Sequence, residues 1–248
     1  MTDNLEESSK NHFIDIYNRR IALKGIFESV KNETAKYMDF GCSSGYMLED
    51  VLKNYPNIDA YGADYYDAGL TQCHNTLPSV PLFQVDLLEC PFPDSYFDAI
   101  TCLNVIEHIK EDTKALSQLA RILKPGGRLV VTVPAGPTLF DMYDEIHYHE
   151  KRYSLDNLIK NVENAGISIL HANYFGFFIF PAFYCTKVLN KLRFGKLSMK
   201  EKMNIVMKQA NGSKRLPFME KISRFEKRIG ERIRFPFGVR CYLYGTKK

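Results

Sequence analysis

The chain has 248 residues, of which 45% are hydrophobic and 25% charged, with a net charge of only +4. This composition excludes a disordered chain, and the length predicts one domain with an insertion rather than two full domains. Six cysteines without a C-x-x-C spacing exclude a disulfide-rich secreted fold, and the polar, acidic start is unlike a signal peptide. We therefore expect a cytoplasmic protein.

The N-terminal segment, residues 1–36, contains apolar residues at helical spacing and is expected to form a helical cap. After it, short apolar runs alternate with helical patterns. The expected strands cover residues 37–40, 59–64, 81–86, 97–104, 127–134, 167–175 and 239–248. The expected helices cover residues 45–55, 68–77, 113–123 and 154–166. This alternation is typical of βαβ units and predicts an α/β fold, a doubly wound, Rossmann-like, mostly parallel seven-stranded sheet with helices on both faces.

The pattern changes after about Phe175. Residues 176–236 begin with a run dense in aromatics that Gly176 and Pro181 interrupt, too short for a membrane-spanning helix. Basic helical sequence follows. We expect a helical insertion here, before a last, antiparallel strand, so that the core comprises residues 37–175 and 237–248.

Charge is also distributed unevenly along the chain. Residues 186–236 contain 15 Lys or Arg against 4 Glu, which leaves the rest of the chain acidic. This uneven distribution of charge indicates either a basic face for an anionic partner or a solvated helical surface, and both interpretations stay open.

Three features that an adenosine cofactor needs occur in order after the first three strands. The glycine turn of residues 39–45, DFGCSSG, follows the first strand and lets the backbone approach a ligand. Asp64 ends the second strand, where its carboxylate can accept hydrogen bonds from both ribose hydroxyls. Asp86 ends the third, placed to accept from the adenine amino group while the Leu87 N–H meets the ring.

A nicotinamide dinucleotide fits this turn poorly. Counting from Gly41, Ser43 and Tyr46 occupy the positions of the second and third glycines of G-x-G-x-x-G. A polar Asp39 and an aromatic Tyr46 suit a ligand that lacks a pyrophosphate but has an amino-acid carboxylate and ammonium. S-adenosylmethionine has these groups.

The sequence here resembles the class I S-adenosylmethionine-dependent methyltransferases, in the branch with quinone-biosynthesis, small-molecule and sugar enzymes. Five motifs carry the resemblance in order: DFGCSSGYML, YGADYYDAGL, QVDLLECPFPDSYFDAITCLNVIEHI, LARILKPGGRLVVTVP and HYHEKRYSLDNLIKNVENAGI. The resemblance implies an enzyme that binds S-adenosylmethionine and releases S-adenosylhomocysteine, with Asn104 under the sulfonium. The predicted cofactor-binding residues are Asp39, Gly41, Cys42, Gly45, Tyr46, Asp64, Tyr65, Asp86, Leu87 and Asn104. Ser43 departs from the branch, which usually has glycine there.

Methyl transfer to a hydroxyl benefits from a base, and two histidines are candidate catalytic residues. His108 follows the fourth strand, and His149 lies in the segment after the fifth, within an H-x-x-R-Y string. Structural roles for both stay open. His147 and His149, two residues apart beside carboxylates, also raise a metal site, but the branch resembles metal-independent enzymes, and we expect none.

The insertion is the best sequence signal for the acceptor. Aromatic and basic sequence together predicts peripheral contact with an anionic membrane, where a lipid-linked sugar acceptor would be found. A lid or a homodimer contact is the alternative. We do not expect a nucleic-acid partner, because no RNA-binding module or N-P-P-Y motif occurs, although an RNA methyltransferase and a noncatalytic S-adenosylmethionine-binding or scaffold protein remain the competing interpretations.

Overall fold

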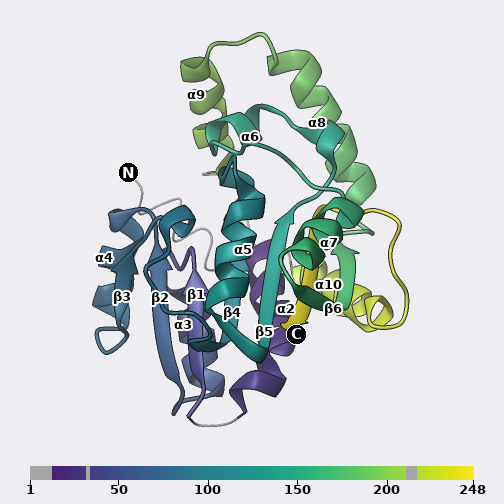
Figure 1. Ribbon diagram of the computed structural model, residues 1–248. Helices are drawn as coiled ribbons and strands as arrows, with labels where there is room; N and C mark the ends of the chain where they lie inside the picture. The colour runs from purple at the N-terminus through teal and green to yellow at the C-terminus, as the bar shows by residue number, and fades with distance from the viewer. Residues whose placement is uncertain (1–12, 32–33, 211–216) are drawn as a thin grey trace.

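The computed structural model describes residues 13–31, 34–210 and 217–248. These residues form one seven-stranded sheet with the strand order β3-β2-β1-β4-β5-β7-β6 (Figure 1). The strands are β1 (Lys36–Phe40), β2 (Asp59–Asp64), β3 (Leu82–Gln84), β4 (Phe97–Leu103), β5 (Leu123–Pro134), β6 (Ile167–Phe175) and β7 (Arg240–Lys247). The winding direction reverses between β1 and β4, the point at which open α/β sheets bind ligands beyond the carboxyl ends of their strands.

The strand directions confirm the predicted fold class. Strands β3, β2, β1, β4 and β5 pair in parallel, whereas β7 pairs antiparallel with both β5 and β6. The last strand of the chain is thus inserted between two strands that precede it. Both neighbours run with the parallel set, so the carboxyl ends of β1, β2, β4, β5 and β6 lie along one edge of the sheet.

Helices cover both faces of the sheet, as the alternation predicts (Figure 1). Helices α2, α3 and α4 pack on one face, and α5 and α7 pack on the other. The helices are α2 (Phe13–Val30), α3 (Tyr46–Asn54), α4 (Asp67–Thr76), α5 (Asp112–Ile122), α6 (Met142–Ile146), α7 (Leu155–Asn164), α8 (Phe180–Phe194), α9 (Met199–Ala210) and α10 (Pro217–Gly230). Three short 3-10 turns are η1 (Leu87–Glu89), η2 (Ile106–His108) and η3 (Pro137–Leu139).

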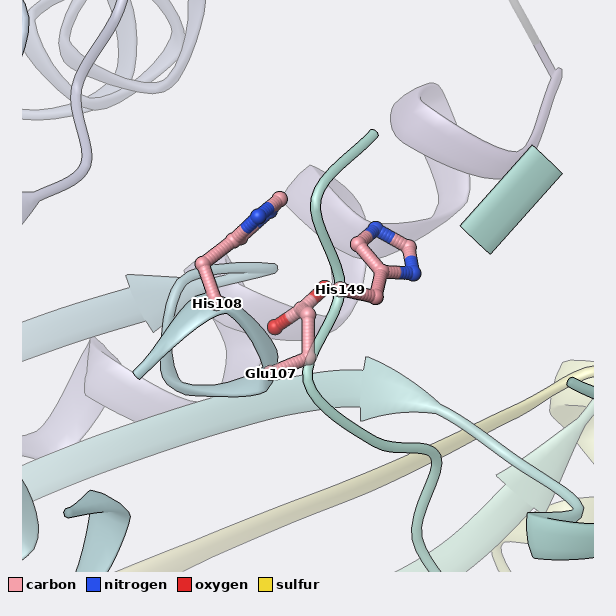
Figure 2. A group of neighbouring side chains, drawn as sticks. All are labelled: Glu107, His108 and His149. Carbon is pink, nitrogen blue, oxygen red and sulfur yellow. The ribbon is translucent and has the colours of Figure 1, made fainter. Parts of the chain in front are cut away.

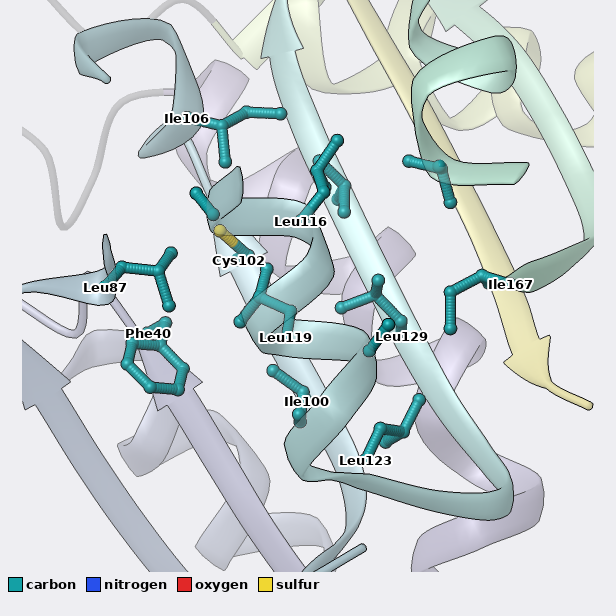
Figure 3. Close-up of a cluster of buried hydrophobic side chains, with 14 of the residues drawn as sticks. Phe40, Leu87, Ile100, Cys102, Ile106, Leu116, Leu119, Leu123, Leu129 and Ile167 are labelled. Carbon is teal, nitrogen blue, oxygen red and sulfur yellow. The ribbon is translucent and has the colours of Figure 1, made fainter. Parts of the chain in front are cut away.

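Alternation along the strands divides the core into two layers. In β5, Leu129 packs on the α5 side and Val130 on the α2 side, because successive side chains of a strand point to opposite faces. Figure 3 shows Leu116 and Leu119 of α5 against Ile100 of β4 and Leu129. These side chains are fully buried.

Strand β5 begins earlier than the sequence predicts. The residues between the expected helix of residues 113–123 and the expected strand of residues 127–134 lie inside β5, where the register shifts so that Phe97 pairs with Leu123 but Ala99 pairs with Arg128. Gly126 has a φ of +77°, a conformation that glycine adopts without steric cost. Proline and glycine therefore make a bulge here rather than end the strand.

The helices of residues 176–236 lie in two places. Helices α8 and α9 stand above the carboxyl edge of the sheet and contact α6, whereas α10 packs on β6 and α2 (Figure 1). In the described part of the chain, no helix combines the length and apolarity needed to cross a membrane.

Helix α2 packs on the sheet face, mainly against β4 and β5. Its first turn lies close enough to Arg240, at the start of β7, for Asp15 to influence the charge of that guanidinium. Residues 1–12, which belong to the predicted N-terminal cap, lie outside the described residues.

Candidate functional site

The turn between β1 and α3 requires glycine at two positions. Gly41 and Gly45 have φ angles of +76° and +81°. A Cβ atom on Gly41 would lie 2.2 Å from Cγ2 of Val105, and one on Gly45 would lie 2.4 Å from Sγ of Cys73. Ser43, which stands where the methyltransferases that this sequence resembles usually have glycine, also has a positive φ of 44°. A residue with a side chain thus occupies a left-handed conformation that favours glycine.

The N–H groups of this turn are used within the protein. Gly41 and Cys42 both donate to the carbonyl of Ala63, at 2.7 and 3.1 Å, and the Ser43 N–H donates to Asp64 Oδ2 at 2.9 Å. A turn that cradles a pyrophosphate would point these donors at the ligand. The turn therefore suits a ligand that packs closely against the backbone, and it does not suit a pyrophosphate that must accept hydrogen bonds from these N–H groups.

Asp64 follows β2, beside the turn. Its Oδ1 accepts from the Tyr66 N–H at 2.9 Å, so each carboxylate oxygen has one backbone donor and keeps a second lone pair. The carboxylate is half-buried, and the neighbouring Tyr65 side chain is exposed. These spare lone pairs can accept from two ribose hydroxyls.

Asp86 and Leu87 come after β3, which pairs with β2. Asp86 is exposed, and its Oδ1 accepts from the Leu88 N–H at 2.8 Å, which holds the carboxylate at the start of η1. The Leu87 side chain is buried in the core. Within the described residues, the second carboxylate oxygen of Asp86 accepts no hydrogen bond. It is therefore available to accept one from an adenine amino group.

Asp39 is the most deeply placed of the predicted cofactor residues. Thr101 Oγ1 donates to its Oδ1 at 2.6 Å, and burial raises the pKa of the Asp39 carboxyl to about 7. Cys42 is buried beside it, and Tyr46 is half-buried at the start of α3, with the Arg19 guanidinium 5.9 Å from its ring centroid. A positive ligand group at this depth would favour the ionised carboxylate.

Asn104 follows β4 and has a φ of +58°. Its N–H donates to the Thr132 carbonyl at 2.9 Å, and its Oδ1 accepts from Arg240 Nη1. Arg240 Nε and both amide atoms of Asn18, on α2, are buried without a hydrogen-bond partner in the described structure. Buried polar atoms of this kind are usually satisfied, so they indicate where a ligand supplies partners.

The predicted catalytic histidines lie together. The rings of His108, on η2, and His149, after α6, have centroids 4.7 Å apart in an edge-to-face arrangement. Figure 2 shows the Glu107 carboxylate below and between them. Desolvation and the nearby His149 lower the pKa of His108 to about 4, although part of the ring is exposed. The base role of either histidine stays a prediction.

Sequence reasoning missed Glu107. The residue is fully buried, and neither carboxylate oxygen has a hydrogen-bond partner within the described residues. Burial raises the pKa of its carboxyl to about 7, although the positive charge of Arg240 acts to lower it. The sequence signal was its position beside His108, directly after a strand. Its burial depends on contacts with segments distant in the chain, which no local pattern indicates.

A buried polar network positions His149. Asp144 Oδ1 accepts from His149 Nδ1 at 2.8 Å, and Arg152 Nε contacts both Asp144 oxygens at 2.8 and 2.9 Å. Burial raises the pKa of Asp144, but hydrogen bonds from His149 and Arg152 and the charge of Lys187 outweigh it and hold the pKa well below its usual range. Arg152 Nη1 also donates to the Ala135 carbonyl, which ties the segment to the end of β5.

Part of the positive charge of residues 186–236 is used inside the molecule. Lys187 of α8 contacts Asp141 Oδ1 at 2.5 Å and Asp144 Oδ2 at 3.2 Å, and Lys202 of α9 contacts Glu145 Oε2 at 2.5 Å. Both lysines are buried. These pairs attach the helices above the sheet to the acidic segment around α6, so the charge count from the sequence overstates what an outside partner can meet.

Comparison with known proteins agrees with this geometry. Residues 38–131 match the model of a methyltransferase domain. A Mycolicibacterium smegmatis protein named a probable S-adenosylmethionine-dependent methyltransferase is 27% identical over 137 residues, 53% of this chain and 51% of that protein. The ubiquinone/menaquinone biosynthesis C-methyltransferase UbiE of Vibrio cholerae is 39% identical over 121 residues, 47% of this chain and 43% of that protein. The chain thus spans about half the length of these curated relatives.

The fold is also that of a solved methyltransferase. The phosphoethanolamine N-methyltransferase 2 of Haemonchus contortus, solved in complex with S-adenosyl-L-methionine, superposes with a TM-score of 0.59. The superposition covers 95% of this chain and 57% of that one, at 13% identity. At this identity the similarity shows the shared fold.

Proposed function

We propose that the chain is a class I S-adenosylmethionine-dependent methyltransferase that transfers a methyl group to a hydroxyl of a small-molecule acceptor, a sugar or a lipid-linked saccharide precursor. The observation that carries the proposal is the turn of residues 41–45 beside Asp64. Its glycines leave no room for side chains, and its N–H groups bond internally. Both properties suit the methionine end of the cofactor and not a pyrophosphate.

The roles of the chain's own residues follow from their positions. S-adenosylmethionine, when bound, supplies a methyl carbon that a positive sulfur activates. Asp64 and Asp86 hold the nucleoside, Asp39 faces the positive end, and Asn104 orients the reacting centre. In-line displacement depends on alignment and exclusion of water, so these residues act mainly by positioning.

The acceptor lies on the side of Glu107, His108 and His149. Helices α8 and α9 contact α6 above this edge of the sheet, and α8 also contacts η3. The buried contacts of Lys187 and Lys202 hold both helices to the segment that contains His149. Helices α8 and α9 therefore act as a cover that excludes water from the reacting groups.

A membrane-associated acceptor is supported by the outer surface of α8. Tyr184, Leu189 and Leu192 are 47%, 46% and 79% exposed, and Lys191 and Arg193, on either side of Leu192, are exposed too. Exposed apolar side chains flanked by basic residues favour contact with an anionic bilayer. A lipid-linked saccharide would reach the active site at that surface.

The test is an acceptor screen with purified protein and S-adenosylmethionine. We expect S-adenosylhomocysteine formation with a saccharide acceptor, and mass spectrometry should place the new methyl group on oxygen. Methylation of a quinone carbon, the chemistry named for the Vibrio cholerae relative, or of RNA would contradict the proposed acceptor but not methyl transfer. Cofactor binding without turnover on any acceptor class would favour a noncatalytic binding protein.

A further inference from the structure

We propose that Glu107, His108 and His149 form a binding site for one divalent first-row transition-metal ion. A ligand atom from each of the three side chains lies within 4.8 Å of the other two. The residues come from two segments, η2 and the loop after α6, whose side chains converge on one point (Figure 2). This site shares only His149 with the His147 and His149 pair considered from the sequence.

Glu107 is the strongest sign of a missing partner. Its side chain is fully buried, and neither carboxylate oxygen has a hydrogen-bond partner within the described residues. An uncompensated carboxylate is among the most costly groups to bury, and folded proteins pair such groups or coordinate a metal with them. The carboxylate lies beside the two histidine rings, so an ion held by those rings would supply its partner.

His149 is already oriented as a metal ligand. The Asp144 carboxylate also accepts from Arg152 and Lys187, so the hydrogen bond at 2.8 Å must be donated by His149 Nδ1. That tautomer leaves Nε2 with a lone pair and no proton. A carboxylate that fixes the other ring nitrogen is the usual support of a metal-bound histidine.

The donor set selects the class of ion. Two imidazole nitrogens and one carboxylate suit zinc, manganese or ferrous iron, whereas magnesium and calcium prefer oxygen ligands alone. Bonds of about 2.0–2.2 Å place two ligands of one ion roughly 3 to 4 Å apart, so small side-chain rotations from the present spacing complete the site.

Three protein ligands leave at least one position open on the ion. Because His108 is exposed, the open coordination position of the ion would face outward. Asn104 lies three residues before Glu107 on the same loop. An acceptor oxygen bound to the ion would thus lie near the residue assigned to the reacting centre. This role of the ion rests on the proposed function, whereas the binding of the ion does not. It also gives His108 the role of a ligand in place of the base predicted from the sequence.

The experiment is a calorimetric titration of chelator-treated protein with Mn²⁺, Zn²⁺ and Mg²⁺. Mn²⁺ has little affinity for thiols, which separates this site from free cysteines such as the exposed Cys185. We expect one Mn²⁺ or Zn²⁺ per chain, bound at least about tenfold more tightly than Mg²⁺. Glu107→Gln and His149→Gln should each weaken binding at least about tenfold.

His147→Gln is the matched control, because its ring lies near His149, with centroids 6.0 Å apart, but outside the cluster. It should change the affinity by less than about twofold. Absence of stoichiometric binding, or equal loss in the control and the cluster variants, overturns the site. S-adenosylmethionine affinity, measured on each variant, shows that the protein is folded. Cofactor binding without metal binding contradicts the metal site alone, and metal binding without cofactor binding contradicts the proposed function alone.

Discussion

Gly41 has no room for a side chain, and its neighbour Val105 is the reason. A Cβ atom there would lie 2.2 Å from Val105 Cγ2, and the φ of +76° is unfavourable for any residue with a side chain. Val105 belongs to the loop after β4 that carries Asn104 and Glu107. The glycine thus allows the turn between β1 and α3 and the loop after β4 to pack against each other.

Gly41→Ala should lower the free energy of unfolding by about 2 to 4 kcal/mol, because the left-handed backbone and the overlap with Val105 both add cost. Urea denaturation measures this loss. In the double variant Gly41→Ala/Val105→Ala the overlap is removed, so the two changes should be less harmful together than their sum. Strict additivity would show that the contact with Val105 does not matter.

The raised pKa of Asp39 predicts a pH dependence of cofactor affinity. The free protein holds a proton on Asp39 up to about pH 7, because burial penalises the carboxylate. A positive ligand favours the ionised form, so binding releases this proton below that pH. Affinity for S-adenosylmethionine should therefore rise with pH and level off above about 7. Calorimetry over this range should show a weaker dependence in Asp39→Asn, and an unchanged dependence would place the titrating group elsewhere.

At the scale of elements, a few buried charges join helices that the sequence separates widely. Lys187 of α8 reaches Asp141 and Asp144 around α6, and Lys202 of α9 reaches Glu145. Asp144 in turn contacts His149. Movement of α8 and α9 is thereby linked to the position of a residue at the acceptor side.

Lys187→Met should lower the free energy of unfolding by about 3 to 5 kcal/mol, because it leaves the two buried carboxylates without this cation. It should also increase hydrogen exchange in α8. Lys191→Met, one turn later on the same helix but exposed, is the matched control and should change stability by less than about 0.5 kcal/mol. Equal effects of the two variants would argue against the anchoring role of Lys187.

For the whole molecule, local patterns predict the sheet well, and they also place the candidate cofactor residues, whose roles stay predictions, at the ends of its strands. The turn at residues 41–45 and the carboxylates of Asp64 and Asp86 are read from strand ends and glycine spacing, which are local properties. Glu107 and Lys187 were not predictable in this way. Their burial and their partners depend on contacts between segments that meet only in the folded chain, and Lys187 lies 43 residues from Asp144. The bulge in β5 was missed because Pro and Gly also mark ordinary turns.

The exposed surface of α8 predicts membrane binding by the whole protein. Leu189→Ser/Leu192→Ser should weaken sedimentation with anionic vesicles at least about fivefold, because both side chains are exposed to the bilayer. Binding should fall with added salt and be weak on neutral vesicles. Leu170→Ser, a change at an exposed leucine of β6, is the control. Absence of vesicle binding, or vesicle binding that the α8 variant leaves unchanged, would contradict the role of this surface.

We propose above all that the turn between β1 and α3 and the carboxylate after β2 hold a methyl donor. We would titrate S-adenosylmethionine and, separately, NAD into the purified protein by calorimetry, with Asp64→Ala as the comparison. We expect binding of S-adenosylmethionine but not of NAD, and loss of that binding in Asp64→Ala, because the removed carboxylate is expected to accept hydrogen bonds from the ribose. Absence of S-adenosylmethionine binding to the unmodified protein, or unchanged binding in Asp64→Ala, would contradict it.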